Sequence, residues 1–338
     1  MEFILYIHIF KQVEEKFWSP YIKFMEENLQ HYPNIFCLIG PRKPKKEIGN
    51  TSKVIHINKI DDFSYLEMLM TKSSKIFLHG LWFEFVCRII NDKELGAKTY
   101  WIPWGGDFYY KSNLSHECIS CMKKIGHIIT PVSYDIAYLR KVYNCVAEPI
   151  KIFRYPNMFH RPDLICENNG NRYINTWVVG NSAYPSNNHQ KAFKFLAPFR
   201  DSINVYAPLS YGSRRYANLV VAAGRKIFRK NFSFSYKFYN LESYSKILAR
   251  TKGGVMMHQR QQALGNCALL LGLGKTLYLK KMSPNWQHLK EIGFVVRDDS
   301  SRQLEVITDK ERHHNIQLSA ELFNPKKFKE DWEDIFSQ

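Results

Sequence analysis

Residues 254–280 read GVMMHQRQQALGNCALLLGLGKTLYLK, and their pattern decides the fold class of this chain. An apolar run ends at His258, a polar cluster follows, and residues 263–273 have the apolar density of a helix packed on a sheet. A second apolar run then begins at Thr276. Strand, turn, helix and strand in immediate succession are typical of a parallel α/β sheet. The polar cluster lies at the helix N-terminus, where Arg260 and the helix dipole favour a phosphate, and a nucleotide diphosphate is the expected ligand.

A merely solvated turn would show the same order of elements, but a second stretch repeats the arrangement. Residues 176–189 read TWVVGNSAYPSNNH, an apolar strand that runs into a turn rich in hydrogen-bond donors. Gly180 lets the backbone approach a ligand closely, and either Ser186 or Asn188 is placed to cap the next helix. Two such turns favour convergent loops at the carboxyl edge of one parallel sheet, where open α/β folds bind ligands.

Residues 101–110, WIPWGGDFYY, are the most distinctive stretch of the first half. An apolar strand stops at a glycine pair, and Asp107 follows between aromatic rings. In one interpretation Asp107 caps the next helix in a structural turn. In the other it is the general base or anchor for an acceptor hydroxyl, with Trp104 and Tyr109 stacking on sugars. His79 ends the preceding strand and is either a satisfied buried histidine or a second catalytic residue.

Four segments together resemble the bacterial 4-acetamido-4,6-dideoxygalactose transferases, the TDP-Fuc4NAc:lipid II transferase family of enterobacterial common antigen synthesis (glycosyltransferase family 56). They are WIPWGGDFYY, VVGNSAYPSNNH, VYAPLSYG and MMHQRQQALGN, which occur in the expected order within residues 75–295. The resemblance implies a GT-B fold, in which two Rossmann-like domains face a cleft and the last helix crosses back. It also implies a dTDP-sugar donor, a polyprenyl-diphosphate oligosaccharide acceptor and residence at the inner face of the bacterial cytoplasmic membrane.

The resemblance implies that the donor diphosphate is bound by the turn after residue 179 and by the segment 258–266. The candidate donor-binding residues are Gly180, Asn181, Ser182, Asn188, His189, Tyr211, His258, Arg260, Gln261, Gln262, Gly265 and Asn266. Those expected to bind the acceptor are Trp104, Gly105, Gly106 and Tyr109, and the catalytic candidates are Asp107 and His79. Arg260 would neutralise the departing nucleotide diphosphate as the glycosidic bond breaks. Because the chain contains no D-x-D, we expect no metal cofactor on the donor.

The chain has 338 residues, enough for two domains with separate cores. We expect an acceptor-binding domain over 1–160, a donor-binding domain over 161–322, and, from the resemblance, a terminal helix over 323–338 that packs on the first domain. Apolar runs predict strands at 3–9, 35–39, 54–57, 75–79, 99–102, 127–130, 150–154, 176–179, 203–207, 234–239, 253–257 and 276–280.

The net charge of +17 is concentrated in the second half. Residues 171–290 contain 19 Lys and Arg against two acids, Asp201 and Glu242. The densest part, 214–230, reads as an amphipathic helix with a basic face. That face is either simply solvated or a contact for anionic lipid head groups or nucleic acid. No nucleic-acid-binding module is recognisable, so the expected partner surface is the membrane.

Seven scattered cysteines indicate free thiols in a reducing compartment. Cys118 and Cys121 form one C-x-x-C, which is either a pair of thiols in a helix or part of a zinc or redox site. No apolar run reaches the roughly 18 residues of a spanning helix, and 1–10 reads as a strand rather than a signal peptide. We therefore expect a cytoplasmic or peripheral membrane protein.

Three functions remain open at this point. The first is a glycosyltransferase that moves a deoxy-amino sugar to a lipid-linked or surface-polysaccharide acceptor such as an O-antigen precursor. The second is a GT-B-like nucleotide-sugar epimerase, which would convert the donor without an acceptor. The third is a non-catalytic protein that binds nucleotide sugars or anionic membrane. Turnover without an acceptor distinguishes the second function, and binding without turnover distinguishes the third.

Overall fold

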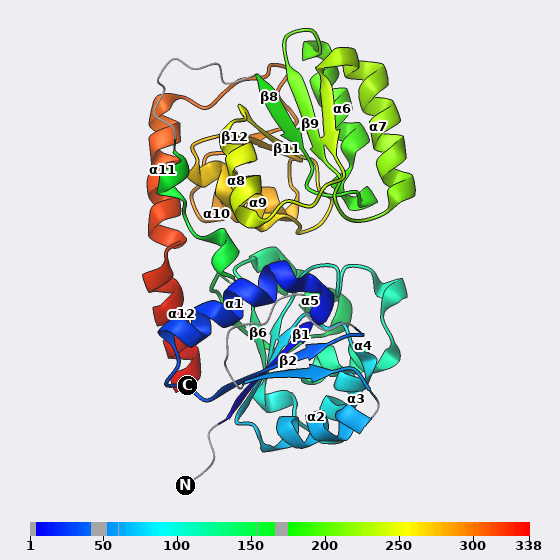
Figure 1. Cartoon of the computed structure of the whole chain (residues 1–338), viewed down its shortest axis with the longest axis vertical. Helices are drawn as coiled ribbons and strands as arrows, with labels where there is room; N and C mark the ends of the chain where they lie inside the picture. Colours follow the sequence, from blue (N-terminus) through cyan, green and yellow to red (C-terminus); the bar gives the residue numbers. More distant parts are fainter. Residues whose placement is uncertain (1–4, 42–52, 60, 154, 166–174) are drawn as a thin grey trace. The chain divides into compact units, whose positions relative to one another are not determined.

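A computed structural model describes residues 5–41, 53–59, 61–153, 155–165 and 175–338 (Figure 1). The chain divides into two compact units, Met1–Asn157 together with Pro325–Gln338, and Met158–Asn324. The boundaries expected from the sequence, at 160 and 322, lie within three residues of these positions. Parts of the expected strands 3–9 and 150–154 lie outside the described residues.

The first unit is built on a parallel sheet with the strand order β3-β2-β1-β4-β5-β6-β7. Its strands are β1 (Tyr6–Lys11), β2 (Asn34–Ile39), β3 (Val54–Ile57), β4 (Lys75–His79), β5 (Thr99–Ile102), β6 (His127–Ile129) and β7 (Glu148–Ile150). Its helices are α1 (Glu15–Asn28), α2 (Asp61–Lys72), α3 (Glu84–Asp92), α4 (His116–Lys124), α5 (Ser133–Tyr143) and α12 (Pro325–Ser337). The order reverses between β1 and β4, which creates a topological switch point.

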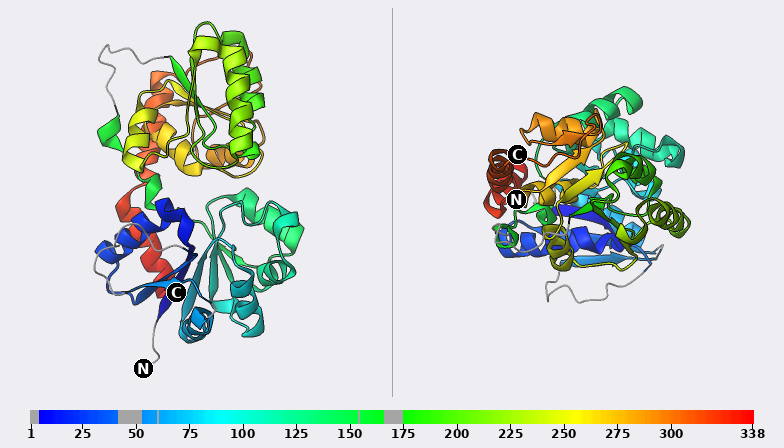
Figure 2. Two further views of the ribbon diagram at one scale, coloured as in Figure 1. Left: turned by 45° about the vertical axis from the view of Figure 1, so that its right-hand side comes forward. Right: turned by 90° about the horizontal axis from the view of Figure 1, so that it is seen from above.

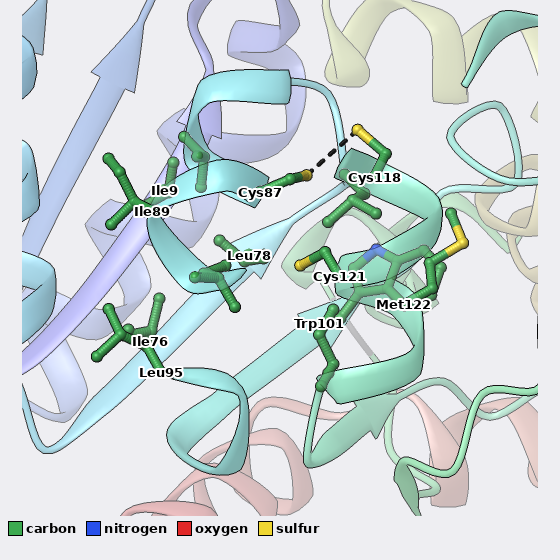
Figure 3. Packing of buried hydrophobic residues seen from close by; sticks show 14 of the residues in the cluster. Ile9, Ile76, Leu78, Cys87, Ile89, Leu95, Trp101, Cys118, Cys121 and Met122 are labelled. Atoms are coloured by element: carbon green, nitrogen blue, oxygen red, sulfur yellow. Dashed lines mark hydrogen bonds between the residues drawn. The ribbon is translucent and has the colours of Figure 1, made fainter. Parts of the chain in front are cut away.

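Strand side chains alternate between two apolar layers of this unit. On one face Ile9 and Leu78 join a core that includes Cys87 of α3 and Cys118 of α4, as Figure 3 shows. On the other face Phe77 packs against Trp332 of α12, with the ring centroids 5.3 Å apart. Figures 1 and 2 show α12 in red beside α1 in blue. Both faces are covered, as an all-parallel sheet requires.

The second unit has the strand order β10-β9-β8-β11-β12-β13, again fully parallel. Its strands are β8 (Thr176–Val179), β9 (Asn204–Pro208), β10 (Phe232–Ser235), β11 (Gly253–Met256), β12 (Thr276–Leu279) and β13 (Arg297–Asp298). Its helices are α6 (His189–Leu196), α7 (Arg214–Phe228), α8 (Leu241–Ala249), α9 (Leu264–Gly272), α10 (Pro284–Glu291) and α11 (Asp309–Leu322). The short polar β13 was not predicted, since it lacks an apolar pattern.

Helices α6 and α7 lie side by side and share a core with one face of this sheet (Figure 1). Helix α9, which is apolar on nearly every side, packs on the other face, where a Cβ on Gly254 would lie 2.6 Å from Leu270. A glycine in the strand therefore lets a fully apolar helix approach the sheet closely. The predicted α/β class with two parallel sheets is confirmed.

Candidate functional site

Three loops of the second unit meet at the carboxyl edge of its sheet. Strand β8 lies between β9 and β11, and the order of the sheet reverses between β8 and β11. The loop after β8 is hydrogen-bonded to both neighbours, because the Gly180 N–H donates to Val255 O at 3.2 Å and the Ala183 N–H to Tyr211 O at 2.7 Å. Ligands of open α/β sheets bind at such a switch point. The loops predicted from the sequence to converge lie together here.

Gly180 is required for this geometry. Its φ of +67° falls in the left-handed region that glycine adopts without strain. A Cβ at this position would lie 2.8 Å from both Asn187 Oδ1 and His189 Nε2. The residue therefore brings the loop backbone against two buried polar side chains, and any larger residue would push them apart.

Asn187 joins the loops, although the sequence pattern did not single it out. It is fully buried, and its Oδ1 accepts from the Asn181 N–H at 2.8 Å. The same oxygen lies 3.1 Å from His258 Nε2, so Nε2 is assigned the ring proton. The Asn187 amide then donates to Ser182 Oγ at 2.9 Å. No periodicity marks such a residue, because its role depends on contacts between loops far apart in the sequence.

Gln262 makes the second connection. Its Nε2 donates to Asn181 Oδ1 at 3.0 Å, and its Oε1 accepts from the Ser186 hydroxyl at 2.7 Å. Its backbone is held by Asn285, which accepts from the Gln262 N–H at 3.3 Å and donates to its carbonyl at 2.5 Å. Asn285 was also missed from the sequence, since it lies in α10, beyond the next strand.

The capping role expected for Ser186 or Asn188 was wrong. No side chain caps α6, and Asn188 at its N-cap has a left-handed backbone with φ 52°. A capping side chain requires the extended backbone that Ser, Thr or Asn usually adopt there. The Ser186 hydroxyl instead donates a hydrogen bond to Gln262 Oε1.

Three buried polar atoms of this site have no hydrogen-bond partner among the described residues: His189 Nε2, His258 Nδ1 and Gln261 Oε1. Burial lowers the pKa of His189 to about 4. Burial, Arg260 and His189 together lower the pKa of His258 to about 3. Both imidazoles are therefore neutral at pH 7, and His258 Nδ1 presents a lone pair. Unpaired buried groups of this kind indicate a polar ligand.

Arg260 and the start of α9 supply the positive character of the site. Arg260 is half-buried, and its Nη1 donates to the Gln261 carbonyl at 2.9 Å. Ala263 occupies the N-cap of α9 with φ 57°, and no side chain caps the helix. The first turn contains Gly265 and Asn266, whose Nδ2 donates to Tyr244 OH at 3.0 Å. An uncapped helix N-terminus beside a guanidinium fits a phosphate.

Tyr211 is tied into the same network. Its hydroxyl accepts from Asn181 Nδ2 at 2.7 Å, and the side chain is half-buried. The structure therefore brings every sequence-predicted donor residue to this edge of one sheet, through the three loops and the starts of α6 and α9.

In the first unit Asp107 ties two loops together. Its carboxylate, 2% exposed, accepts from the Leu81 N–H at 2.9 Å, Trp101 Nε1 at 3.0 Å and the Trp104 N–H at 2.8 Å. Burial raises the pKa of Asp107, and the three hydrogen bonds lower it by a smaller amount. It caps no helix, because a turn follows it. The geometry supports the structural interpretation of Asp107, in which it holds the turn after β5 against the loop after β4.

His79 is fully buried. Its Nδ1 lies 2.9 Å from Tyr155 OH, and its Nε2 lies 3.3 Å from His8 Nδ1. Burial and the proximity of His8 lower its pKa well below the usual value. Neither ring nitrogen faces solvent, so the geometry supports the satisfied buried histidine rather than a group that reaches substrate.

The residues expected to bind the acceptor differ in their accessibility. Trp104 is half-buried, and its indole N–H donates to Tyr155 OH at 2.8 Å. Gly105 has φ 84° and forms the turn, and a Cβ on Gly106 would lie 3.3 Å from the Trp82 ring. Tyr109 donates to Asp135 Oδ1 at 2.5 Å, which ties it to α5. Trp104 is only half-buried, whereas the Tyr109 hydroxyl is already engaged.

The C-x-x-C lies in α4 with both thiols buried, and Cys118 Sγ lies 3.2 Å from Cys87 Sγ (Figure 3). Within the described ranges, no group of three or more His, Cys, Asp and Glu side chains is arranged to hold a metal ion. Nor does that part of the chain contain a helix whose length and apolar character would let it cross a membrane.

Known structures share this architecture. The Anabaena protein HepE, in complex with UDP and glucose, is similar with a TM-score of 0.70 and 8% identity, over 99% of this chain and 100% of that chain. A UDP-forming trehalose-phosphate synthase from Burkholderia xenovorans gives 0.67 and 9%, over 99% of both chains. The E. coli trehalose-6-phosphate structure bound with UDP-2-fluoro glucose gives 0.67 and 8%, over 98% and 99%. The shared fold is that of the GT-B glycosyltransferases.

The sequence also matches a family model described as 4-alpha-L-fucosyltransferase, glycosyl transferase group 56, over residues 65–338. That range includes both candidate sites. The match decides between the three functions that the sequence left open in favour of the first class, an enzyme that transfers sugars. The chain therefore belongs to glycosyl transferase group 56 and is a glycosyltransferase.

Proposed function

We propose that this glycosyltransferase moves a 4-acetamido-4,6-dideoxygalactose, or a related deoxy-amino sugar, from a dTDP-sugar to a lipid-linked or surface-polysaccharide acceptor. The family description supports the class of sugar, since fucose is itself a 6-deoxygalactose. The solved neighbours that carry UDP or a UDP-sugar support a nucleotide-sugar donor. The observation that carries the proposal is the group of unpaired, buried polar atoms where three loops meet beside the N-terminus of α9.

The donor would bind with its diphosphate at the start of α9. When the glycosidic C–O bond breaks, its electron pair passes to the diphosphate oxygen, and the developing charge is stabilised by Arg260 and the helix dipole. The N–H groups of the first turn are fixed before the reaction, so little reorganisation opposes the transfer. These groups act in place of a metal ion, and we propose that none is needed. His189, His258 and Gln261 would fix the nucleoside or the sugar through their unpaired atoms.

The acceptor hydroxyl attacks the anomeric carbon as the bond to the diphosphate breaks, and its proton passes to the departing diphosphate. We propose that the acceptor sugar stacks on the half-buried Trp104 ring in the first unit, beside the turn that Gly105 and Gly106 form. Asp107 and His79 are assigned positioning roles, since each shapes this edge through buried hydrogen bonds. A lipid-linked acceptor would place the enzyme at the inner face of the cytoplasmic membrane.

Calorimetric titration with dTDP, UDP and GDP, without added metal, tests the donor site. We expect selective dTDP binding that Arg260→Ala weakens at least tenfold. Arg250→Ala is the matched control, because Arg250 is exposed and precedes β11 at the opposite edge of the same sheet. Equal binding by both variants would remove Arg260 from the site, and no binding of any nucleotide would overturn the donor assignment.

A transfer assay with a dTDP-deoxy-amino sugar and a polyprenyl-diphosphate-linked oligosaccharide tests the reaction itself. Removal of a group that stabilises the developing charge typically lowers kcat by about 100- to 1,000-fold. We expect a loss of this size for Arg260→Ala, whereas Arg250→Ala retains full activity. Transfer that requires an added divalent cation, and disappears with a chelator, would contradict metal independence.

A further inference from the structure

The outward face of α7 carries basic residues at both ends of the helix. Its exposed positions on the helix and on the short turn after it are Arg214, Arg215, Asn218, Leu219, Ala222, Arg225, Lys226, Arg229 and Lys230. Six of these nine positions carry a positive charge, and none is acidic. The buried side of the helix packs on the sheet through Ala217, Val220 and Val221. We call these exposed positions, together with the adjoining Tyr236 to Phe238, the α7 face.

No acidic side chain neutralises the α7 face within the described part of the chain. None of its seven basic residues, the six on α7 and the turn after it together with Lys237, forms an ion pair there. The two acids of the stretch 171–290 are engaged elsewhere, Glu242 with Arg161 at 2.7 Å and Asp201 with Arg200 at 3.6 Å. A dense, uncompensated charge of one sign costs free energy through self-repulsion, and an anionic partner removes that cost.

Aromatic rings shape the same face. The Arg214 guanidinium lies over the Tyr236 ring at 3.4 Å, and Arg225 lies over Phe234 at 5.4 Å. Tyr236 OH donates to Asn218 Oδ1 at 3.0 Å, which fixes the end of β10 against α7. Beside these polar groups, large apolar side chains reach into solvent: Leu219 is 61% exposed and Phe238 is 56% exposed. Basic side chains with interspersed exposed apolar ones are typical of helices that lie in a membrane interface.

We propose that the α7 face docks this enzyme on an anionic lipid surface, with the basic residues on the phosphate head groups and with Leu219 and Phe238 inserted between them. The face is built on a helix, and the described residues around it belong to no nucleic-acid-binding motif. A bilayer rich in anionic lipid is the partner that matches both its charge and its exposed apolar side chains.

Docking through α7 would also position the donor site. The loop that enters α7 is bonded to the donor loop, since the Ser213 N–H donates to Ala183 O at 2.9 Å. Ser213 then caps the helix by accepting from the Tyr216 N–H. The donor loops and the membrane-facing helix are therefore parts of one rigid edge. This use of the face builds on the proposed lipid-linked acceptor, but binding to lipid is measurable without any transfer.

Flotation with vesicles tests the inference. The wild-type protein is expected to bind vesicles of about 30% phosphatidylglycerol in phosphatidylcholine more tightly than pure phosphatidylcholine, with an affinity that falls as salt rises. The variant R225Q/K226Q/R229Q/K230Q removes four charges from the α7 face. Since each basic residue near a membrane contributes roughly fivefold in affinity, a loss of at least about tenfold is expected after screening.

A matched control removes the same charge from the first unit. The variant K123Q/K124Q/R140Q/K141Q changes four exposed basic residues on α4 and α5. It is expected to bind anionic vesicles within about twofold of wild type. Equal losses in the two variants would show attraction by net charge alone and would overturn the assignment to α7. A second variant, L219S/F238S, is expected to weaken binding several-fold without changing the net charge.

Two further readouts separate this inference from the proposed function. Calorimetry with dTDP is expected to give the wild-type value for the four-charge α7 variant, because these residues lie outside the donor loops. If the wild-type protein binds vesicles but does not bind dTDP, the proposed function is overturned and the inference about the α7 face stands. If the α7 variant loses affinity for duplex RNA at physiological salt while it still binds vesicles as wild type does, the face binds nucleic acid instead.

Discussion

Asn187 holds the loop after β8 in shape and ties it to the loop after β11 through a single amide group. It accepts from the Asn181 N–H and from His258, and it donates to Ser182. Its removal leaves two buried donors without an acceptor, which costs more than the loss of an exposed hydrogen bond. Asn187 therefore fixes the position of these loops relative to one another.

Asn187→Ala is expected to lower the free energy of unfolding by about 3 kcal/mol and to abolish measurable dTDP binding. Urea denaturation and calorimetry measure the two effects. Asn175→Ala is the control, since Asn175 is exposed before β8 and its side chain donates to Ser202 O. We expect a loss below about 1 kcal/mol there, with nucleotide binding retained. A small loss at Asn187 would show that the loops are held by other contacts.

The two buried histidines of the site predict a dependence of stability on pH. Burial lowers the pKa of His189 to about 4, whereas the unfolded chain titrates near 6.5. Between these values the unfolded state binds more protons, so stability is complete above pH 6.5 and falls as pH decreases toward 4. Since each pKa unit corresponds to about 1.4 kcal/mol, His189 accounts for roughly 3 kcal/mol of that loss, and His258 acts in the same direction.

Urea unfolding at pH 7.5, 6 and 5 measures this loss. The variant His189→Gln keeps a polar side chain that does not titrate, and its stability is expected to fall less steeply over the same range. Identical slopes for wild type and variant would mean that His189 binds protons equally in the folded and unfolded states, against its buried position.

At the scale of the elements, α12 completes the core of the first unit although it lies at the other end of the sequence. Trp332 is fully buried, with its ring 5.3 Å from both Tyr21 and Phe77. The Tyr6 hydroxyl donates to Phe336 O at 2.9 Å, so α12 also satisfies a polar group of β1. Without α12 the part of this sheet face around Phe77 would be open to water.

Trp332→Ala is expected to destabilise the protein by about 4 kcal/mol, because it removes a large aromatic side chain and leaves a cavity. Lys326→Ala changes an exposed position of the same helix and is expected to cost less than about 0.5 kcal/mol. Thermal or urea unfolding compares the two. Similar stabilities would mean that the first unit folds without the packing of α12.

At the scale of the whole molecule, the two units have separate cores, and the proposed donor contacts lie in the second unit only. A ligand that binds the folded state protects the structure around its site, by about 2.7 kcal/mol at a hundredfold excess over Kd. The first unit has no predicted contact with the nucleotide.

Hydrogen exchange with and without dTDP tests this division. Added protection is expected in residues 180–189 and 258–266, and the exchange of β1 to β7 is expected to remain unchanged apart from general stabilisation. Protection that appears first in residues 101–110 would place the nucleotide in the first unit and would contradict the donor assignment. GDP at the same concentration is the negative control.

Much of the architecture was readable from the sequence because it depends on local patterns. The apolar runs at 75–79, 99–102 and 176–179 coincide with β4, β5 and β8, since a buried parallel strand is a continuous apolar segment. The helix predicted over 263–273 is α9. The strand predicted at 150–154 was misplaced, since β7 spans Glu148–Ile150, and the two-residue β13 had no apolar signal. The ordered motifs led to the correct family.

The sequence by itself determined the α/β class, the family and the polar turns of the donor site, because periodicity and motif order are local properties. Only the tertiary structure decided what each polar side chain touches. It engaged Asp107 and His79 in buried hydrogen bonds, made Asn187 and Asn285 the connections between loops, and left atoms of His189 and His258 unpaired. The physical reason is that hydrogen bonds between loops are set by the strand order 9-8-11, which brings together residues some 80 positions apart and leaves no local pattern.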